Sequence, residues 1–100
     1  MIVVTGSVIA KPGQADAVRA LSLTHVKRSQ SEPGCIAHNV SVDCENASRF
    51  VFVELWQDMS ALMTHFQLDA SRAFVRDLRP LLSEEPIMTI FDANEIDPRG

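Results

Sequence analysis

A strand near the middle of the chain is apolar on both of its faces. Residues 49–57 contain no Gly or Pro and are rich in Val, Phe and Trp, so they are typical of a β-strand. Successive side chains of a strand point to opposite sides of the sheet. One side therefore carries Phe50, Phe52, Glu54 and Trp56, and the other carries Val51, Val53 and Leu55. A strand of this kind must be covered on both sides.

The chain is too short to provide both covers itself. A sequence of 100 residues corresponds to one domain, and its own helices suffice for only one face of a wide antiparallel sheet. We therefore expect a single domain over residues 1–100, with residues 96–100 as a loose tail. We also expect a second copy of the chain to cover the other face, which predicts a homodimer.

Turn and breaker signals divide the rest of the chain into elements. The turn signal at residues 11–13, the Pro33-Gly34 pair and Pro80 each end one element. The predicted elements are strand 2–10, helix 14–30, strand 35–43, strand 49–57, helices from 58 and from 69 to 79, and strand 87–93. This βαββαβ order predicts an α+β, ferredoxin-like fold, with a four-stranded antiparallel sheet and helices on one face.

Periodicity also predicts the direction of individual side chains. Helical spacing places His25 on the inner stripe of the first helix and Arg28 on its outer side. Alternation places Ile36 and His38 on the same face of the second strand. The inner stripe predicted for the helix that begins after Asp58 consists of Met59, Leu62, Met63 and Phe66.

Charge and composition favour a small molecule over a nucleic acid or a membrane as the ligand. Nine Lys and Arg residues against 13 Asp and Glu residues give a net charge of -4, and no basic cluster occurs. No apolar run approaches the roughly 20 residues of a membrane span. The first ten residues lack the pattern of a signal peptide, so we expect a cytoplasmic location.

Neither the cysteines nor the histidines show the spacing of metal ligands. Cys35 and Cys44 bracket one predicted strand and would lie about 30 Å apart at roughly 3.3 Å per residue, which excludes a disulfide between them. The chain has no CxxC or HxxxH motif, so no zinc site of a recognisable type is expected. Cys35 is interpreted as a small packed hydrophobe rather than a reactive thiol.

Five pieces of the sequence resemble one protein family. They are Ser31–Cys35 (SEPGC), Ser48–Trp56 (SRFVFVELW), Asp58, Ala61–Leu62 and His65. Together they are similar to the antibiotic biosynthesis monooxygenase (ABM) family, and the resemblance extends over nearly the whole chain. It implies a dimeric α+β barrel in which two sheets pack face to face, with a cavity between each sheet and its own helices. It also implies oxygenation chemistry that needs no cofactor.

Strand parity and the resemblance together select the candidate site residues. His65 lies at the edge of a helical stripe and is the candidate base or hydrogen-bond donor. Trp56 accompanies it as a second candidate catalytic residue. The candidate substrate contacts are Phe52, Glu54, His25, His38, Met63, Phe66 and Phe74. The chain has no Tyr, so a phenolic donor used by relatives is missing here.

Several candidates have a purely structural alternative. His65 could be a helix-edge histidine bonded to a backbone carbonyl or water, and Trp56 could simply pack in the core. Glu54 could be a solvated or helix-cap partner, or the group that orients His65. His25 and His38 could be pocket contacts or satisfied polar groups. The sequence leaves these alternatives open.

The predicted function is oxidation of a reduced aromatic or quinol-like molecule by dioxygen, with the electrons supplied by the substrate. Haem breakdown, which the family also includes, is not expected because Thr5-Gly6-Ser7 in the first strand contains no Asn. One alternative is an isomerase of the type that processes phosphorylated autoinducers, although we find no Arg or Lys cluster for a phosphate. The other is a non-catalytic dimeric module for ligand binding or stress response.

Overall fold

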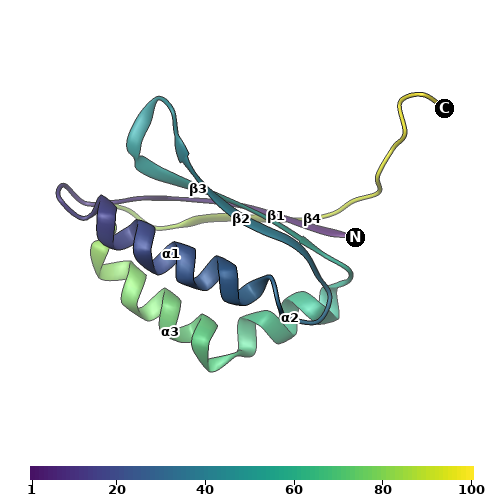
Figure 1. The fold of residues 1–100 in the computed structure, drawn as a ribbon, viewed down its shortest axis with the longest axis horizontal. Helices are drawn as coiled ribbons and strands as arrows, with labels where there is room; N and C mark the ends of the chain where they lie inside the picture. The colour runs from purple at the N-terminus through teal and green to yellow at the C-terminus, as the bar shows by residue number, and fades with distance from the viewer.

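The computed structural model describes residues 1–100 and confirms the predicted α+β, ferredoxin-like fold. All four strands form one antiparallel sheet in the order β2-β3-β1-β4. The helices lie together on one face of this sheet (Figure 1). The elements are β1 (Ile2–Ile9), α1 (Ala15–Ser29), β2 (Cys35–Asp43), β3 (Asn46–Trp56), α2 (Met59–Gln67), α3 (Asp69–Leu78), the 3-10 turn η1 (Arg79–Leu81) and β4 (Ile87–Asp92).

One element end differs from the prediction by more than one residue. β3 begins at Asn46 rather than at residue 49, so the hairpin turn is shorter than predicted. α3 ends at Leu78, within one residue of the end predicted from Pro80, and Pro80 itself lies in the first turn of η1. No helix in the structure is both long enough and apolar enough to cross a membrane.

Two apolar clusters fill the space between the sheet and the helices. The smaller cluster consists of Ile2, Val4, Trp56 and Leu62. The larger cluster consists of Val8, Ala10, Val18, Val26, Phe50, Phe52, Leu78 and Leu82. Trp56 and Leu62 have no exposed surface at all. These clusters fix β3 against α2 and α3, which are the elements that surround the candidate site.

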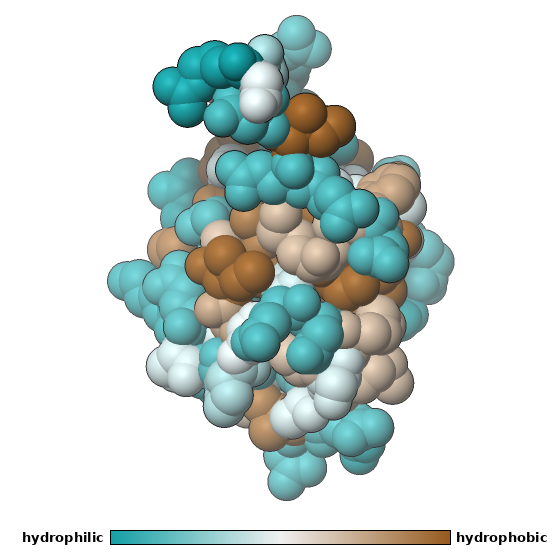
Figure 2. All heavy atoms as spheres, turned by 90° about the vertical axis from the view of Figure 1, so that its right-hand side faces the viewer, coloured by the Kyte–Doolittle hydropathy of each residue, from teal (hydrophilic) through white to brown (hydrophobic).

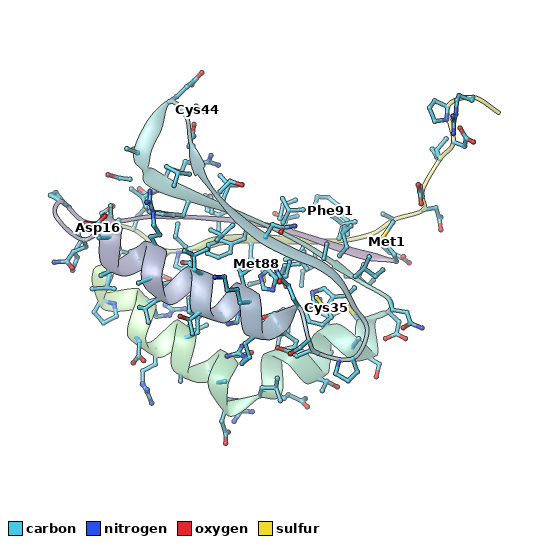
Figure 3. The ribbon with its side chains drawn as sticks, viewed as in Figure 1. Met1, Asp16, Cys35, Cys44, Met88 and Phe91 are labelled. Atoms are coloured by element: carbon cyan, nitrogen blue, oxygen red, sulfur yellow. The ribbon has the colours of Figure 1, made fainter.

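The two faces of β3 differ as strand parity predicts. Phe52 and Trp56 are buried against the helices, whereas 43% of Val53 is exposed on the opposite face. On β4, Phe91 projects from the helix-free side of the sheet and Met88 projects toward the helices (Figure 3). The helix-free face is therefore apolar and uncovered in the single chain. The homodimer that would cover it stays a prediction.

The predicted direction of Ile36 is wrong, and that of His38 is right. Ile36 is 57% exposed, whereas His38 is 1% exposed and faces the helices. The pairing of β2 with β3 shifts register between Cys35 and Ala37. Such an irregularity breaks the alternation of side chains along a strand. Ile36 lies in it and turns away from the core.

The chain after Asp92 forms no helix or strand. This segment leads away from the body of the molecule, as the yellow end of the ribbon in Figure 1 shows. It stands clear of the rest of the surface at the top of Figure 2, where most of its atoms are hydrophilic. Two hydrogen bonds of 2.9 Å join the start of this segment to the residue before β1: Ala93 N donates to Met1 O, and Met1 N donates to Ala93 O.

Gly34 holds the loop before β2 against α2. Its φ is +82°, and a Cβ atom at this position would lie 2.5 Å from Ala61 Cβ. Its carbonyl accepts a hydrogen bond of 2.8 Å from Gln57 N. We expect Gly34→Ala to lower the free energy of unfolding by about 2–4 kcal/mol, because left-handed strain adds to overpacking against α2.

Gly13→Ala is the matched control for this prediction. Gly13 has a similar φ of +79°, but no atom lies within 4 Å of the position its Cβ would take. This variant therefore adds backbone strain alone, about 1–2 kcal/mol. Urea unfolding of both variants gives the comparison. Equal losses would show that the contact with Ala61 is not tight.

Candidate functional site

A cavity of about 520 Å³ lies between the sheet and the helices. It is large enough for a small organic ligand. Seven of the nine predicted site residues line it, and they come from α1, β2, β3, α2 and α3. These residues are His25, His38, Phe52, Glu54, His65, Phe66 and Phe74.

Met63 does not line the cavity, so its predicted position is wrong. The buried residues of α2 are Leu62 and His65, and Met63 is 43% exposed. Neighbouring residues of a helix point about 100° apart. The apolar stripe predicted from the sequence was wide enough to include Met63. In the structure, however, the side of α2 that carries Leu62 and His65 packs against the sheet. Met59, on the same stripe, is also exposed.

Trp56 lies beneath the cavity rather than in its wall. It is fully buried, and its ring centroid is 4.8 Å from that of His65. Its Nε1–H donates a hydrogen bond of 2.9 Å to Glu54 Oε1. This position favours the alternative of a packed core residue over direct contact with a ligand as a catalytic residue. The side chain instead anchors the buried carboxylate of Glu54.

Glu54 is a buried carboxylate with two neighbours. One oxygen accepts the Trp56 bond, and the other, Oε2, lies 3.6 Å from His38 Nε2. Burial raises the pKa of Glu54 above its usual value, although the Trp56 bond and the nearby His65 act in the opposite direction. Glu54 therefore joins the site as a polar group on its floor rather than as a solvated residue.

We expect Trp56→Phe to destabilise the protein mainly through Glu54. The variant removes the Nε1–H donor and leaves the buried carboxylate with one partner fewer, which costs about 1–3 kcal/mol in free energy of unfolding. Adding Glu54→Leu removes the unpaired carboxylate and should recover part of the loss. Denaturant unfolding of the two single variants and the double variant tests this. Strictly additive losses would exclude the coupling.

The three histidines of the chain converge on the cavity from three elements. His25 comes from α1, His38 from β2 and His65 from α2. One nitrogen of each ring lies within 4.8 Å of the others. Burial, together with the neighbouring histidines, lowers the pKa of His25 to about 3 and that of His38 to about 4. Both rings are therefore neutral at pH 7.

His65 is oriented by a carboxylate that sequence reasoning did not select. Glu32 Oε1 lies 2.8 Å from His65 Nδ1. A carboxylate accepts, so Nδ1 carries the proton and Nε2 of a neutral His65 carries the lone pair. The signal for Glu32 was present, because it belongs to the Ser31–Cys35 segment that resembles the family. Its role was hidden because no local spacing connects residue 32 with residue 65.

Arg28 bends toward the site instead of facing outward as predicted. One of its Nη atoms lies 2.9 Å from His25 Nδ1 and 3.2 Å from Ser71 Oγ. A guanidinium only donates, so His25 Nδ1 accepts and the proton of neutral His25 is on Nε2. Arg28 Nε also lies 3.7 Å from Glu32 Oε2. Arg28, the partner of His25, therefore also lies next to Glu32, the partner of His65.

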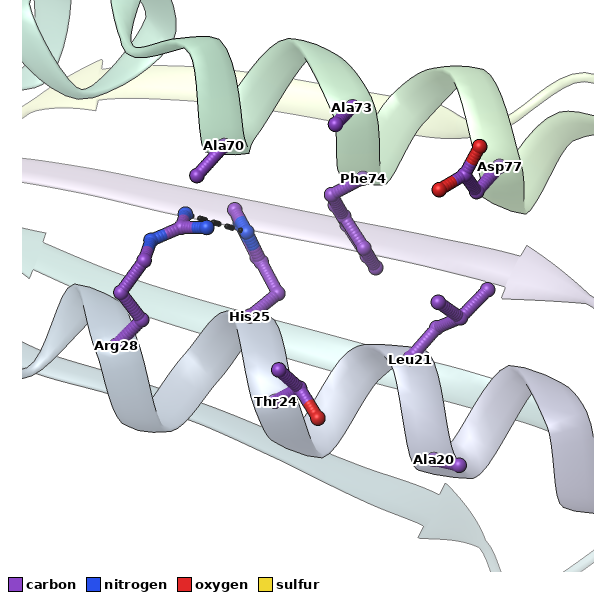
Figure 4. Close-up of a pocket in the computed structure, with 9 residues that line it drawn as sticks. All are labelled: Ala20, Leu21, Thr24, His25, Arg28, Ala70, Ala73, Phe74 and Asp77. Atoms are coloured by element: carbon purple, nitrogen blue, oxygen red, sulfur yellow. Dashed lines mark hydrogen bonds between the residues drawn. The ribbon is translucent and has the colours of Figure 1, made fainter.

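A smaller hollow of about 360 Å³ lies between α1 and α3, on the other side of His25. Figure 4 shows the Arg28–His25 hydrogen bond in its wall, with Phe74 reaching across from α3. The rings of His25 and Phe74 stack with centroids 4.0 Å apart and an angle of 6° between their planes. Both residues also line the larger cavity. The stacked pair therefore forms a partition between the two hollows.

Two arginines also line the larger cavity, which the sequence did not indicate. Arg72 is on α3 and Arg79 is on η1. They are seven positions apart in the sequence, so they form no visible basic cluster, but a spacing of about two helical turns places both on the side that lines the cavity. Arg79 is also paired with Glu85 at 3.0 Å. These cations bring positive charge to an otherwise mainly apolar wall.

The sequence of residues 1–77 matches the model of the antibiotic biosynthesis monooxygenase family. The chain belongs to this family. A Deinococcus radiodurans protein that carries the same family name has the same fold, with a TM-score of 0.92, 24% identity and coverage of 97% of this chain and 96% of that one. Another crystal structure of an antibiotic biosynthesis monooxygenase has a TM-score of 0.88, 27% identity and coverage of 95% and 100%.

The ABM chain also has a curated relative, the uncharacterized Synechocystis protein sll1783. The two are 35% identical over 94 residues, which is 94% of this chain. This chain spans 64% of that relative's length. The family recognised from the sequence segments is thus confirmed. The reaction and the substrate have to be inferred from the geometry of the site.

Proposed function

We propose that this ABM chain is a monooxygenase that uses dioxygen to oxidise a reduced aromatic or quinol-like small molecule without a cofactor. The observation that supports this most is the position of His65. Its side chain is 3% exposed, lines the cavity and is bonded through Nδ1 to Glu32, which leaves Nε2 free to accept a proton. Family membership supports the reaction class.

The apolar part of the cavity suits a flat aromatic ring. Phe52, Phe66 and Phe74 line it, and Phe52 and Phe74 are arranged edge to face with centroids 6.4 Å apart. Aromatic side chains bind an aromatic ligand through apolar burial and ring stacking. A largely dry pocket also strengthens the interaction of a developing anion with the nearby polar groups. The ring would be held between β3 and α3.

The proposed reaction begins with proton transfer from the substrate to His65 Nε2. Glu32 stabilises the resulting imidazolium through the Nδ1–H bond, as a carboxylate does for a catalytic histidine. The substrate anion passes one electron to dioxygen, and the two radicals combine into a peroxide. For an anthrone, His65 then returns its proton to the peroxide. Collapse of the resulting hydroperoxide places one oxygen atom in the quinone carbonyl and releases the other as water, which carries the two hydrogens of the oxidised CH2 carbon.

Oxygen consumption by chelator-treated protein tests the proposal. A panel of anthrones and quinols is supplied without flavin or metal, and dioxygen uptake and quinone are measured together. We expect one molecule of dioxygen to be consumed for each anthrone oxidised. Binding of the same aromatics can be monitored by the quenching of Trp56 fluorescence. Binding without any dioxygen uptake would favour the non-catalytic module instead.

The two cavity arginines favour a second candidate function. Arg72 and Arg79 would attract a phosphate or carboxylate on the ligand. With His65 as a base, such a ligand could undergo proton transfer alone, as in the isomerases of phosphorylated autoinducers. Exchange of substrate hydrogen with solvent deuterium under anaerobic conditions would identify that activity. An oxygen requirement for every turnover would exclude it.

A further inference from the structure

The convergent histidines lack hydrogen bonds to one another. His25 bonds to Arg28 and His65 bonds to Glu32, but no bond joins two of the three rings. His38 Nδ1 is buried and has no hydrogen-bond partner in the protein, and the residue as a whole is 1% exposed. Buried polar atoms normally have a partner. Three imidazoles facing one another in this way form a donor set for a ligand between them.

We propose that His25, His38 and His65 bind one divalent transition-metal ion, with Zn²⁺ as the ion they suit best. Three imidazoles are a ligand set that zinc accepts, with the fourth position left for water or another ligand. Their nitrogens lie within 4.8 Å of one another. Tetrahedral zinc with Zn–N bonds of 2.0–2.1 Å requires about 3.4 Å between ligand nitrogens. Side-chain rotations that move each nitrogen by about 1 Å supply the difference.

Two carboxylates next to the histidines favour the cation. Glu32 accepts from His65 Nδ1, which is the arrangement that fixes a metal-binding imidazole in position. Glu54 Oε2 lies 3.6 Å from His38 Nε2, and it offers either a second bond of this kind or a direct ligand. All three histidines line the larger cavity, through which an ion can enter.

Arg28 is the residue that opposes metal binding. Its guanidinium donates to His25 Nδ1, so the Nε2 of neutral His25 holds a proton and has no lone pair for a metal. Binding through Nε2 therefore requires Arg28 to release Nδ1. The arginine can do so, because 32% of its side chain is exposed and Glu32 lies 3.7 Å away. Removal of Arg28 should tighten binding of the ion.

The test measures zinc binding to chelator-treated protein. Both thiols are first replaced, by Cys35→Ser and Cys44→Ser, because a free cysteine can also bind zinc. Equilibrium dialysis with Zn²⁺ gives the stoichiometry, and titration with Co²⁺ gives the visible spectrum of a four-coordinate nitrogen site. We expect one ion per chain, with the Kd raised at least about tenfold by His38→Gln. Absence of saturable binding, or binding unchanged by this variant, would overturn the proposal.

Arg28→Gln and its matched control test the opposite effect, a tighter binding of the ion. We expect Arg28→Gln to lower the Kd about tenfold, by freeing His25 Nδ1. Lys27→Gln removes the same charge from the exposed side of the same helix and should leave the Kd unchanged. A higher affinity for the ion cannot arise from misfolding of the variant. Equal effects of the two substitutions would show that Arg28 does not compete with the ion.

Metal binding has a consequence that rests on the proposed function. An ion held by His65 Nε2 occupies the lone pair of the proposed base, so Zn²⁺ should inhibit oxygen uptake and a chelator should restore it. The two proposals fail independently. Zinc binding is measured without substrate, and oxygen uptake is measured without metal, so either result stands when the other is negative.

Discussion

Replacing His65 with alanine is expected to lower kcat for aromatic oxidation by about 10²- to 10⁴-fold. The imidazole is buried, lines the cavity and is held by Glu32. Once it is removed, no other group in that position can accept the proton of the substrate. His38 and His25 line the same cavity, but the pKa values of about 4 and about 3 make both weaker bases than an unperturbed imidazole. The loss should therefore appear in kcat more than in KM.

Met63→Ala is the matched control for that experiment. Met63 lies on α2 beside His65, but it is exposed and contributes nothing to the cavity wall. We expect it to leave kcat and KM unchanged. Steady-state oxygen uptake by the two variants, with folding checked by circular dichroism, gives the comparison. Unchanged turnover in His65→Ala would remove His65 from the mechanism.

Acidification is expected to destabilise the chelator-treated protein between about pH 6.5 and pH 4. In the unfolded chain the pKa of a histidine is about 6.5. In the folded protein the pKa of His25 is about 3 and that of His38 is about 4. Below pH 6.5 the unfolded state takes up protons that the folded state does not, so the free energy of unfolding decreases as the pH is lowered. Above pH 6.5 these two groups make no pH-dependent contribution.

The groups around the two histidines set the size of the effect. A shift of one pKa unit corresponds to about 1.4 kcal/mol, and the two shifts overlap because the rings lie next to each other. We expect a combined loss of about 3–5 kcal/mol by pH 4. Burial is the main cause of both lowered pKa values, and the positive charge of Arg28 and the neighbouring His65 contribute to them. The raised pKa of Glu54 offsets part of it, since the folded state then binds a proton more readily than the unfolded state.

Urea unfolding at a series of pH values from 7.5 to 4 measures this loss. His38→Gln is the informative variant, because it removes one of the two groups and should make the decline less steep. Loss of stability that is equally steep in the variant would show that carboxylates elsewhere in the chain cause it. A stability independent of pH in this range would mean that neither histidine is held neutral.

Period-two alternation predicted β3 well because one physical rule governs it. Along Phe52, Glu54 and Trp56 the pleat alone decides which face each side chain takes, and the sheet confirms that pattern. Ile36 was misplaced because a change of register interrupts the same rule on β2. Met63 was misplaced because a helix of nine residues can rest on either edge of a wide apolar stripe. The neighbouring elements decide which edge is buried.

The histidine cluster could not be read from spacing along the chain. His25, His38 and His65 belong to three elements, and only the packing of α1 and α2 on the sheet brings their nitrogens within 4.8 Å. Arg28 and Glu32 were equally hidden, because their partners depend on how the end of α1 meets α2. A local motif search detects ligands that share a helix or a hairpin, but not ligands that come from three separate elements.

Incorporation of oxygen from ¹⁸O₂ into the product of the metal-free protein tests the central claim most directly. An anthrone is oxidised under labelled gas with chelator present, and the quinone is analysed by mass spectrometry at early time points. The proposed reaction predicts one labelled atom in each quinone and one in water. Product without label, or label that enters only after metal is restored, would contradict it.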